Sequence, residues 1–322
     1  MNLRPLLATL FIVFYSLIQT DLVGQGFYNS NMWRKQRNEL NFSVGVTNFL
    51  GDLGGRDMIG SNFIWDLEIS KTRPAIGFNY LYYIGRSFAL RPQISFGKVA
   101  GDDKLTQESF RNNRNLNFES IILEGALTFE WQFLKEKVGN IYNLKSKTGK
   151  KLGLKSFSLG FYFTGGVGGF FFNPKAVGSD GVKYELHPLR TEGQGLEGGA
   201  TPYKRISVCV PIGFGVRKSI NRNSGFKIEL THRFTFTDYI DDVSTVYYNR
   251  NVLTQEFGPL AGYFSNPQLG NKPNFVTKPG EQRGDPGDKD GYMYFMFSYY
   301  YKITTKNSVF GRNKVRRIKA SF

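Results

Sequence analysis

Two stretches of this 322-residue sequence carry residue types that could bind a ligand. The glycine run Gly165–Gly169 could cradle a phosphate, and the acidic run Gly287–Gly291, with Asp285 nearby, could offer oxygens to Ca²⁺. The glycine run is not followed by a helical pattern, and the acidic run lacks EF-hand spacing and a closing Glu. We interpret the first as glycines of a bent strand and the second as a polar turn. We expect no cofactor and no metal site.

Enzyme chemistry has few candidate residues. A hydrolase or acyltransferase needs a nucleophile beside a base, and the sequence has only two histidines, His187 and His232. His187 falls in a predicted outer loop with no evident serine partner, and His232 falls on the lipid-facing side of a predicted strand near the membrane edge. We therefore expect no catalytic residue and no enzyme activity. Asp238, Asp241 and Asp242 form a further acidic group, which could bind a cation, cap a turn or pair with arginines.

The elements that hold these residues are long alternating segments. Between Asn117 and Phe133, apolar and aromatic side chains alternate with polar ones, two of them glutamates. Side chains alternate between the faces of a strand, and a membrane-crossing strand needs about 9–11 residues plus its ends. This stretch therefore predicts one strand of a transmembrane barrel. A soluble β-sandwich is the alternative that its pattern disfavours.

Seven further segments alternate in the same way. With the first they make about eight strands, at residues 40–46, 75–82, 88–96, 117–133, 157–171, 206–217, 226–236 and 293–301. Long and short connections also alternate, as in outer-membrane barrels with short periplasmic turns and long outer loops. We predict an all-β fold, a single-chain antiparallel transmembrane β-barrel in the cell outer membrane. Pro92 should interrupt its ladder as a bulge or a local break.

A barrel of eight strands has an interior that side chains just fill. The positions on the inner face that can ionise or form strong hydrogen bonds are Arg91, Gln93, Glu124, Glu130, Lys227, Glu229 and Arg233. Buried charges need partners, so the mixed signs predict an internal ion-pair network. A narrow ion or proton path is the alternative.

The formal net charge of +16 is concentrated in two segments on the predicted periplasmic side. One follows the strand at 117–133 and the other ends the chain. Their cations include Lys135, Lys137, Lys145, Lys147, Lys150, Lys151, Arg312, Lys314, Arg316 and Arg317. These residues form either a solvated linker and tail or a surface that docks an acidic periplasmic partner. The pattern does not suggest nucleic-acid binding or a small-molecule substrate.

The N-terminus resembles an export signal. Arg4 precedes a 13-residue apolar run, Leu6–Ile18, which is too short for a typical membrane helix. We expect residues 1–25 to be a removed signal peptide, 26–303 to be the barrel and 304–322 to be a basic periplasmic tail.

Four short stretches resemble the PorG-like family of small outer-membrane barrels. They are GDLGG, TEGQG, TDYIDDVS and RGDP followed by Lys289 and Asp290, and the resemblance runs over residues 33–302. Their family-motif residues in the predicted outer loops are Gly51, Asp52, Thr191, Glu192, Asp238, Asp241 and Asp242.

This resemblance implies a non-enzymatic outer-membrane component of the type IX secretion system, which also serves gliding motility. It implies contact with membrane lipid and with a periplasmic ring built from a lipoprotein and its partner protein. The alternatives are a small-solute or ion channel, a general structural outer-membrane protein and, third, a lipid-modifying barrel enzyme.

Overall fold

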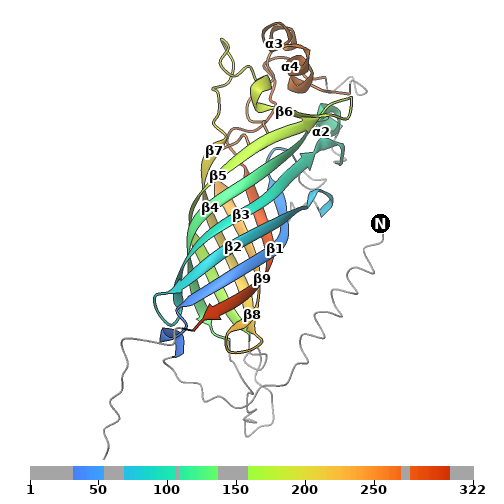
Figure 1. Cartoon of the computed structure of the whole chain (residues 1–322). Coiled ribbons are helices and arrows are strands. Elements are labelled where there is room, and N and C mark those ends of the chain that lie inside the picture. Colours follow the sequence, from blue (N-terminus) through green and yellow to red (C-terminus); the bar gives the residue numbers. More distant parts are fainter. Residues whose placement is uncertain (1–31, 54–68, 106–108, 137–158, 270–275, 305–322) are drawn as a thin grey trace, which may run out of the picture.

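The computed structural model describes residues 32–53, 69–105, 109–136, 159–269 and 276–304 (Figure 1). Eight long strands run antiparallel: β1 (Asn38–Leu50), β2 (Arg73–Tyr83), β3 (Phe88–Asp102), β4 (Asn117–Leu134), β5 (Gly160–Val177), β7 (Ile206–Ser219), β8 (Ser224–Thr235) and β9 (Gly291–Ile303). The sheet order is β4-β3-β2-β1-β9-β8-β7-β5, and β4 also pairs with β5. The eight strands therefore form a closed barrel, which confirms the predicted fold class.

The connections differ in length between the two ends of the barrel. Residues 84–87 and 220–223 make short turns at one end, here called the turn end, where β1 begins and β9 finishes. The opposite loop end carries η3 (Ile69–Lys71), η4 (Asp103–Leu105), α2 (Ser109–Arg114), β6 (Lys183–Glu185), η6 (His187–Leu189), α3 (Arg250–Phe257) and α4 (Pro259–Ser265). A further turn, η1 (Met32–Arg34), precedes β1. Among the described residues, no helix is long and apolar enough to cross a membrane.

Strict alternation separates the two faces of the wall. Along β4, the inward positions from Phe118 to Gln132 are buried, while outward side chains from Leu123 to Phe133 are exposed. Outward aromatic rings meet near the turn end, where the Phe88 and Phe129 rings stack at 5.5 Å and the Trp131 and Phe133 rings meet edge to face at 5.9 Å. An apolar exterior with an aromatic girdle is what a lipid-facing barrel wall requires. The protein is an outer-membrane β-barrel, as the alternation predicts.

The interior has two layers. Toward the loop end, an apolar core contains Phe118, Ile122, Phe170, Phe172 and Tyr294. Toward the turn end, the inward positions are mostly polar, and charged residues such as Glu39, Arg217 and Lys227 lie among them. Glycines make room for the tyrosines of this second layer: a Cβ on Gly215 would overlap the Tyr162 ring, and one on Gly225 would overlap the Tyr300 ring.

The sequence predicts the eight strands but misplaces several ends. β3 and β5 extend six residues further toward the loop end than predicted, to Asp102 and Val177. The short strand β6, which pairs with the end of β5, is not predicted at all, because its three residues lack a visible alternation. At Pro92 the β2–β3 pairing stops and then resumes in the same register, which makes this site a local break and not a bulge.

An arginine scan on one face of one strand tests the membrane placement. Leu127 faces outward near the middle of β4, and Ile121 faces outward near its loop end. Leu127→Arg should lower the free energy of unfolding by about 2–4 kcal/mol, whereas Ile121→Arg should lower it by at most about 1 kcal/mol. Urea unfolding in lipid vesicles measures both. Equal losses at the two depths would contradict the placement of the bilayer.

Candidate functional site

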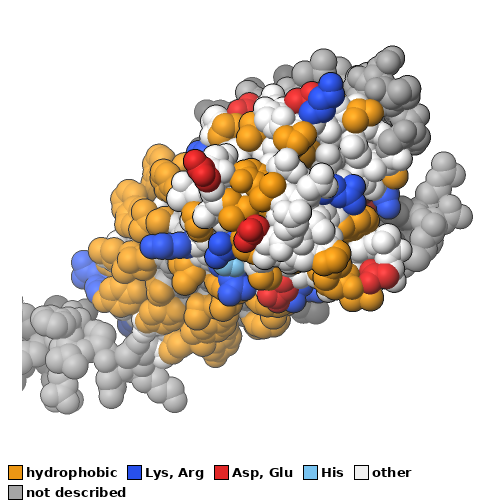
Figure 2. Space-filling view, turned by 90° about the horizontal axis from the view of Figure 1, so that it is seen from above, with side chains coloured by type: hydrophobic (Ala, Val, Ile, Leu, Met, Phe, Trp, Pro, Cys, Tyr) orange, Lys and Arg blue, Asp and Glu red, His pale blue; other side chains and the backbone are white. Residues whose placement is uncertain are grey.

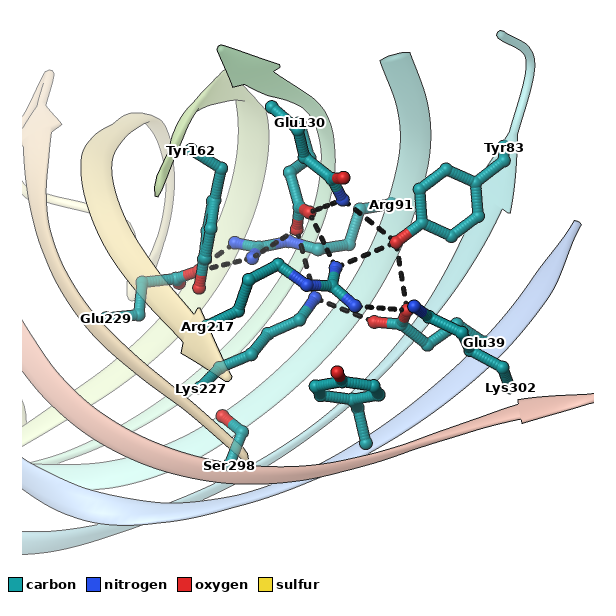
Figure 3. Close-up of polar contacts among 12 residues, drawn as sticks. Glu39, Tyr83, Arg91, Glu130, Tyr162, Arg217, Lys227, Glu229, Ser298 and Lys302 are labelled. Atoms are coloured by element: carbon teal, nitrogen blue, oxygen red, sulfur yellow. Dashed lines mark hydrogen bonds and ion pairs between the residues drawn. The ribbon is translucent and has the colours of Figure 1, made fainter. Parts of the chain in front are cut away.

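The centre of the charged layer is Arg217 on β7, which is fully buried. Its Nη2 atom lies 2.9 Å from an oxygen of Glu39 and 3.0 Å from one of Glu136, and its Nη1 atom lies 3.5 Å from Glu130. The same Nη1 donates a hydrogen bond of 2.8 Å to the Tyr83 hydroxyl (Figure 3). One guanidinium thus holds three carboxylates from different parts of the barrel, which a planar five-donor group is suited to do.

Two more cations complete this layer. The Lys227 ammonium lies 2.8 Å from Glu39 and 3.3 Å from Glu130. Arg91 makes a two-pronged contact with Glu229, and the Tyr162 hydroxyl donates to the same carboxylate at 2.8 Å. Buried charges keep their ionised form only when they are paired and hydrogen-bonded in this way.

Glu136 lies just beyond β4 and closes the turn end. Its carboxylate accepts hydrogen bonds from the Tyr300 hydroxyl at 2.6 Å and from the Lys302 ammonium at 2.8 Å, besides its contact with Arg217. Burial alone would raise the pKa of Glu136, but the Arg217 and Lys302 charges lower it to about 2. The carboxylate is therefore ionised at neutral pH.

A separate ion pair, Glu124 with Arg233, lies nearer the loop end of the barrel. The Glu124 carboxylate binds the Arg233 guanidinium through two hydrogen bonds of 3.0 and 3.1 Å. It also accepts from the Gln93 amide at 3.1 Å and from the Tyr292 hydroxyl at 2.9 Å. The two groups of charges together hold five carboxylates and five cations: Glu39, Glu124, Glu130, Glu136, Glu229, Arg91, Arg217, Lys227, Arg233 and Lys302.

Several of these contacts span the full width of the barrel. In the closed ring, β3 and β8 are four strands apart, and so are β4 and β9. Arg91–Glu229 joins the first pair of strands and Glu124–Tyr292 joins the second. Opposite walls are therefore bonded directly to each other in this part of the lumen.

A second network lies in the loops that cap the barrel. Glu192 is at its centre: it accepts hydrogen bonds from the backbone N–H groups of Ser244 and Thr245, and its Oε1 lies 2.9 Å from Arg283 Nη1. Arg283 also donates to the Asp242 carbonyl at 2.6 Å. The loop before β7 is thereby joined to both ends of the β8–β9 loop.

Aspartates extend this network to the loop after β1. Asp241 accepts from the backbone N–H groups of Leu53 and Val243, each at 3.0 Å. Asp52 accepts from the backbone N–H of Asp285 at 2.8 Å, and Asp242 accepts from the Thr191 and Tyr203 hydroxyls, each at 2.6 Å. These carboxylates act mainly as hydrogen-bond acceptors for backbone N–H and hydroxyl donors.

Carboxylates outnumber cations in the loop network, and this excess of negative charge changes the pKa values of the aspartates. Burial, reinforced by neighbouring carboxylates, raises the pKa of Asp52 to about 6 and that of Asp238 to about 7. Burial and the Asp52 charge raise the pKa of Asp241 well above its usual range, and burial with the Asp241 charge does the same for Asp290. At neutral pH Asp241 and Asp290, and in part Asp238, therefore retain protons that exposed carboxyls would have lost.

The predicted residues fall into three places. Arg91, Gln93, Glu124, Glu130, Lys227, Glu229 and Arg233 all face the lumen and interact there. Of the family-motif residues, Asp52, Thr191, Glu192, Asp238, Asp241 and Asp242 meet in the loop network, and Gly51 lies beside Asp290. Of the predicted docking surface, Lys135 is described, and Lys137, Lys145, Lys147, Lys150, Lys151, Arg312, Lys314, Arg316 and Arg317 lie outside the described residues.

The remaining ligand candidates have structural positions. Gly165–Gly169 lies within β5, so it forms no phosphate-binding loop. Asp285 accepts a hydrogen bond from the Gly287 backbone inside a turn. His187 lies in η6 against Tyr203, and His232 faces outward on β8. Among the described residues, no three His, Cys, Asp or Glu side chains are grouped in a way that would hold a metal ion.

Several network members are not among the predicted ones. Glu39, Tyr83, Tyr162 and Arg217 occupy inward positions that the alternation of their strands could have identified. Glu136 carries no such signal, because it lies beyond the end of β4 and turns back into the lumen.

Removing one charge tests the Glu124–Arg233 ion pair. Glu124→Gln keeps the shape of the side chain but leaves Arg233 buried without a countercharge, so the free energy of unfolding should fall by about 3–5 kcal/mol. Adding Arg233→Met should restore most of the loss, because the uncompensated charge is then gone. Urea unfolding of both variants measures this. A single variant as stable as the wild type would contradict the assigned pairing.

The loop aspartates predict a pH dependence at the loop end. Their folded-state pKa values of about 6 and about 7 lie above the ordinary value of 3.8. Between about pH 4 and pH 7 the folded loops therefore bind more protons than unfolded loops, so their stability falls as pH rises. Hydrogen exchange of the loop amides, corrected for intrinsic rates, should show more protection at pH 5 than at pH 8. Asp238→Asn should reduce this difference, and protection that increases with pH would contradict it.

Two solved structures of bacterial surface and outer-membrane proteins are similar to this chain at low identity. Neisserial surface protein A is 6% identical with a TM-score of 0.34, covering 83% of this chain and 97% of its own. The outer membrane protein OprG from Pseudomonas aeruginosa is 10% identical with a TM-score of 0.33, covering 83% and 98%. No curated protein matches the sequence. A family model matches residues 23–183, half of the chain, and the protein belongs to that family, described as Domain of unknown function (DUF6089).

Proposed function

We propose that this protein is a non-enzymatic outer-membrane anchor for a periplasmic assembly, of the kind that serves type IX protein secretion or gliding. The observation that carries the proposal is the bracing of the lumen. Arg91–Glu229 and Glu124–Tyr292 connect opposite walls, and the charged layer is electrically balanced. Such an interior suits a rigid support better than a conduit.

The loop network supports the resemblance on which the secretion role rests. The four stretches that resemble the PorG-like family come from three different loops, since TDYIDDVS and RGDP both lie between β8 and β9. In the structure, their residues Asp52, Glu192, Asp242 and Arg283 belong to one bonded unit. Residues that act together in one structural unit form a more specific resemblance than four separate short matches.

The turn end is the proposed docking side. Barrels of this class place short turns in the periplasm, and both basic segments leave the barrel at this end. The only acid in the first segment, Glu136, is used inside the lumen, where it binds Lys302 and Arg217. The segment from Lys137 to Lys155 therefore carries only positive charge, which complements an acidic surface of a periplasmic ring protein.

A general structural outer-membrane protein is the second candidate, because a braced barrel would serve that role equally well. The two differ in whether a specific periplasmic partner exists. An ion channel is disfavoured by the same bracing contacts.

Charge removal at the turn end tests the proposed role. Lys135, Lys137, Lys145, Lys147, Lys150 and Lys151 are changed to Gln, and the chain is truncated after Ile303. Cross-linking in membranes followed by quantitative mass spectrometry should recover a periplasmic partner with the wild type and at least about tenfold less with the variant, since complementary charge sets encounter and register.

Loop-end cations provide the control. Arg250→Gln with Lys278→Gln removes exposed charge from the opposite end and should leave partner recovery unchanged. Equal recovery with the turn-end variant would reject the docking surface. Sustained conductance of the inserted wild type in a planar bilayer would instead favour a channel.

A further inference from the structure

A cleft on the outside of the barrel, near the loop end, collects positive charge. It has a volume of about 390 Å³ and lies over the ends of β3, β4 and β5, beside β6. Its cationic lining residues are Lys71, Arg73, Lys104, Lys175 and Lys183, and its carboxylates are Asp102 and Glu119. The cleft therefore has a surplus of three positive charges.

The cleft begins where the apolar belt ends. The outward side chains of Phe96, Leu123 and Phe171 lie level with one another on β3, β4 and β5. Two residues further toward the loop end, β3 presents Lys98. Four residues further, β4 and β5 present Glu119 and Lys175, which face each other in register. These charges therefore lie at the boundary between the hydrocarbon layer and the lipid headgroups.

The existing ion pairs leave donors available. Glu119 is shared by Lys98 at 3.1 Å and Lys183 at 2.8 Å, and Lys175 lies 2.9 Å from Glu185. The side chains of Lys98, Lys175 and Lys183 remain 40%, 34% and 52% exposed. An ammonium group has three N–H donors, so each lysine can bind a further anion while it keeps its present partner.

The charge is confined to one side of the barrel. On β8, β9 and β1, outward residues near the loop end are Phe234, Met293 and Asn48, none of which is cationic. The cation directly before β7, Arg205, lies over the Phe171 ring on the same side as the cleft. Seen from above, the loop end is mostly polar and the barrel wall beside it is covered by hydrophobic side chains (Figure 2). A general attraction to an anionic membrane would not require such a one-sided arrangement.

We propose that this cleft binds the phosphate-bearing headgroup of an anionic lipid in the outer leaflet. Long loops of outer-membrane barrels face outward, so the cleft lies at outer-leaflet headgroup level. The acyl chains of the lipid would pack against Phe96, Leu123 and Phe171. The phosphate would accept hydrogen bonds from Lys175 and Lys183 in the cleft lining and from Lys98, which lies beside the cleft and shares Glu119 with Lys183. Charged donors are the strongest partners for phosphate oxygens.

Native mass spectrometry of the full chain in a neutral detergent tests the proposal, with lipid A as the phosphorylated probe. The wild type should bind lipid A. Lys98→Gln, Lys175→Gln and Lys183→Gln together should weaken binding about 100-fold, since each surface cation contributes about fivefold. The matched control removes three exposed cations elsewhere, Arg222→Gln, Arg250→Gln and Lys278→Gln, and should bind as the wild type does.

Further arms separate charge from folding and lipid from free anion. The same three lysines changed to Arg should retain binding, because charge and donors are kept. Dephosphorylated lipid A should bind far more weakly than lipid A. Equal binding of the Gln variant and the control would overturn the proposal. Inorganic phosphate that displaces lipid A at equal concentration would also overturn it, because the site would then recognise a soluble anion.

Discussion

Electrostatic pairing inside the barrel is the constraint on which the rest of the structure depends. An eight-stranded wall encloses too little space for water to solvate ten ionised side chains. Each charge must therefore find its partner across the lumen. The loss of one partner would leave the other charge unpaired in a poorly solvating interior. Arg217 shows how closely the set is interlocked, because three carboxylates share its guanidinium. The charges can pair only when the sheet is closed, and the closed barrel is stable only when the charges are paired.

The two polar networks solve different physical problems. In the lumen, acids and bases are equal in number and satisfy one another. In the loops, Asp238, Asp241 and Asp290 are buried near one another, and protons take the place of missing cations. The loops at the loop end therefore respond to mild changes of pH. An apolar core containing Phe118 and Phe172 separates the two networks.

The fold could be predicted because lipid imposes a strict pattern. Every second side chain must be apolar, so Leu123, Leu127 and Phe129 mark their strand without any information about neighbours. The lumen set could be predicted in part for the same reason, since Glu124 and Arg233 lie on the inner parity. Glu136 could not, because its position depends on where the chain turns after β4. Nor could the meeting of Asp52 with Asp285, which lie 233 residues apart.

The placement of Glu136 has a mechanical consequence. The chain leaves the membrane beside this residue and again beyond Lys302, on opposite walls of the barrel. Tension applied to either departing segment would first load the Glu136–Lys302 and Glu136–Arg217 contacts, and then the full length of the ladders along β4 and β9. Hydrogen bonds loaded in parallel share a force, whereas those at a free edge break one after another. This arrangement therefore resists a pulling force that is applied at the turn end.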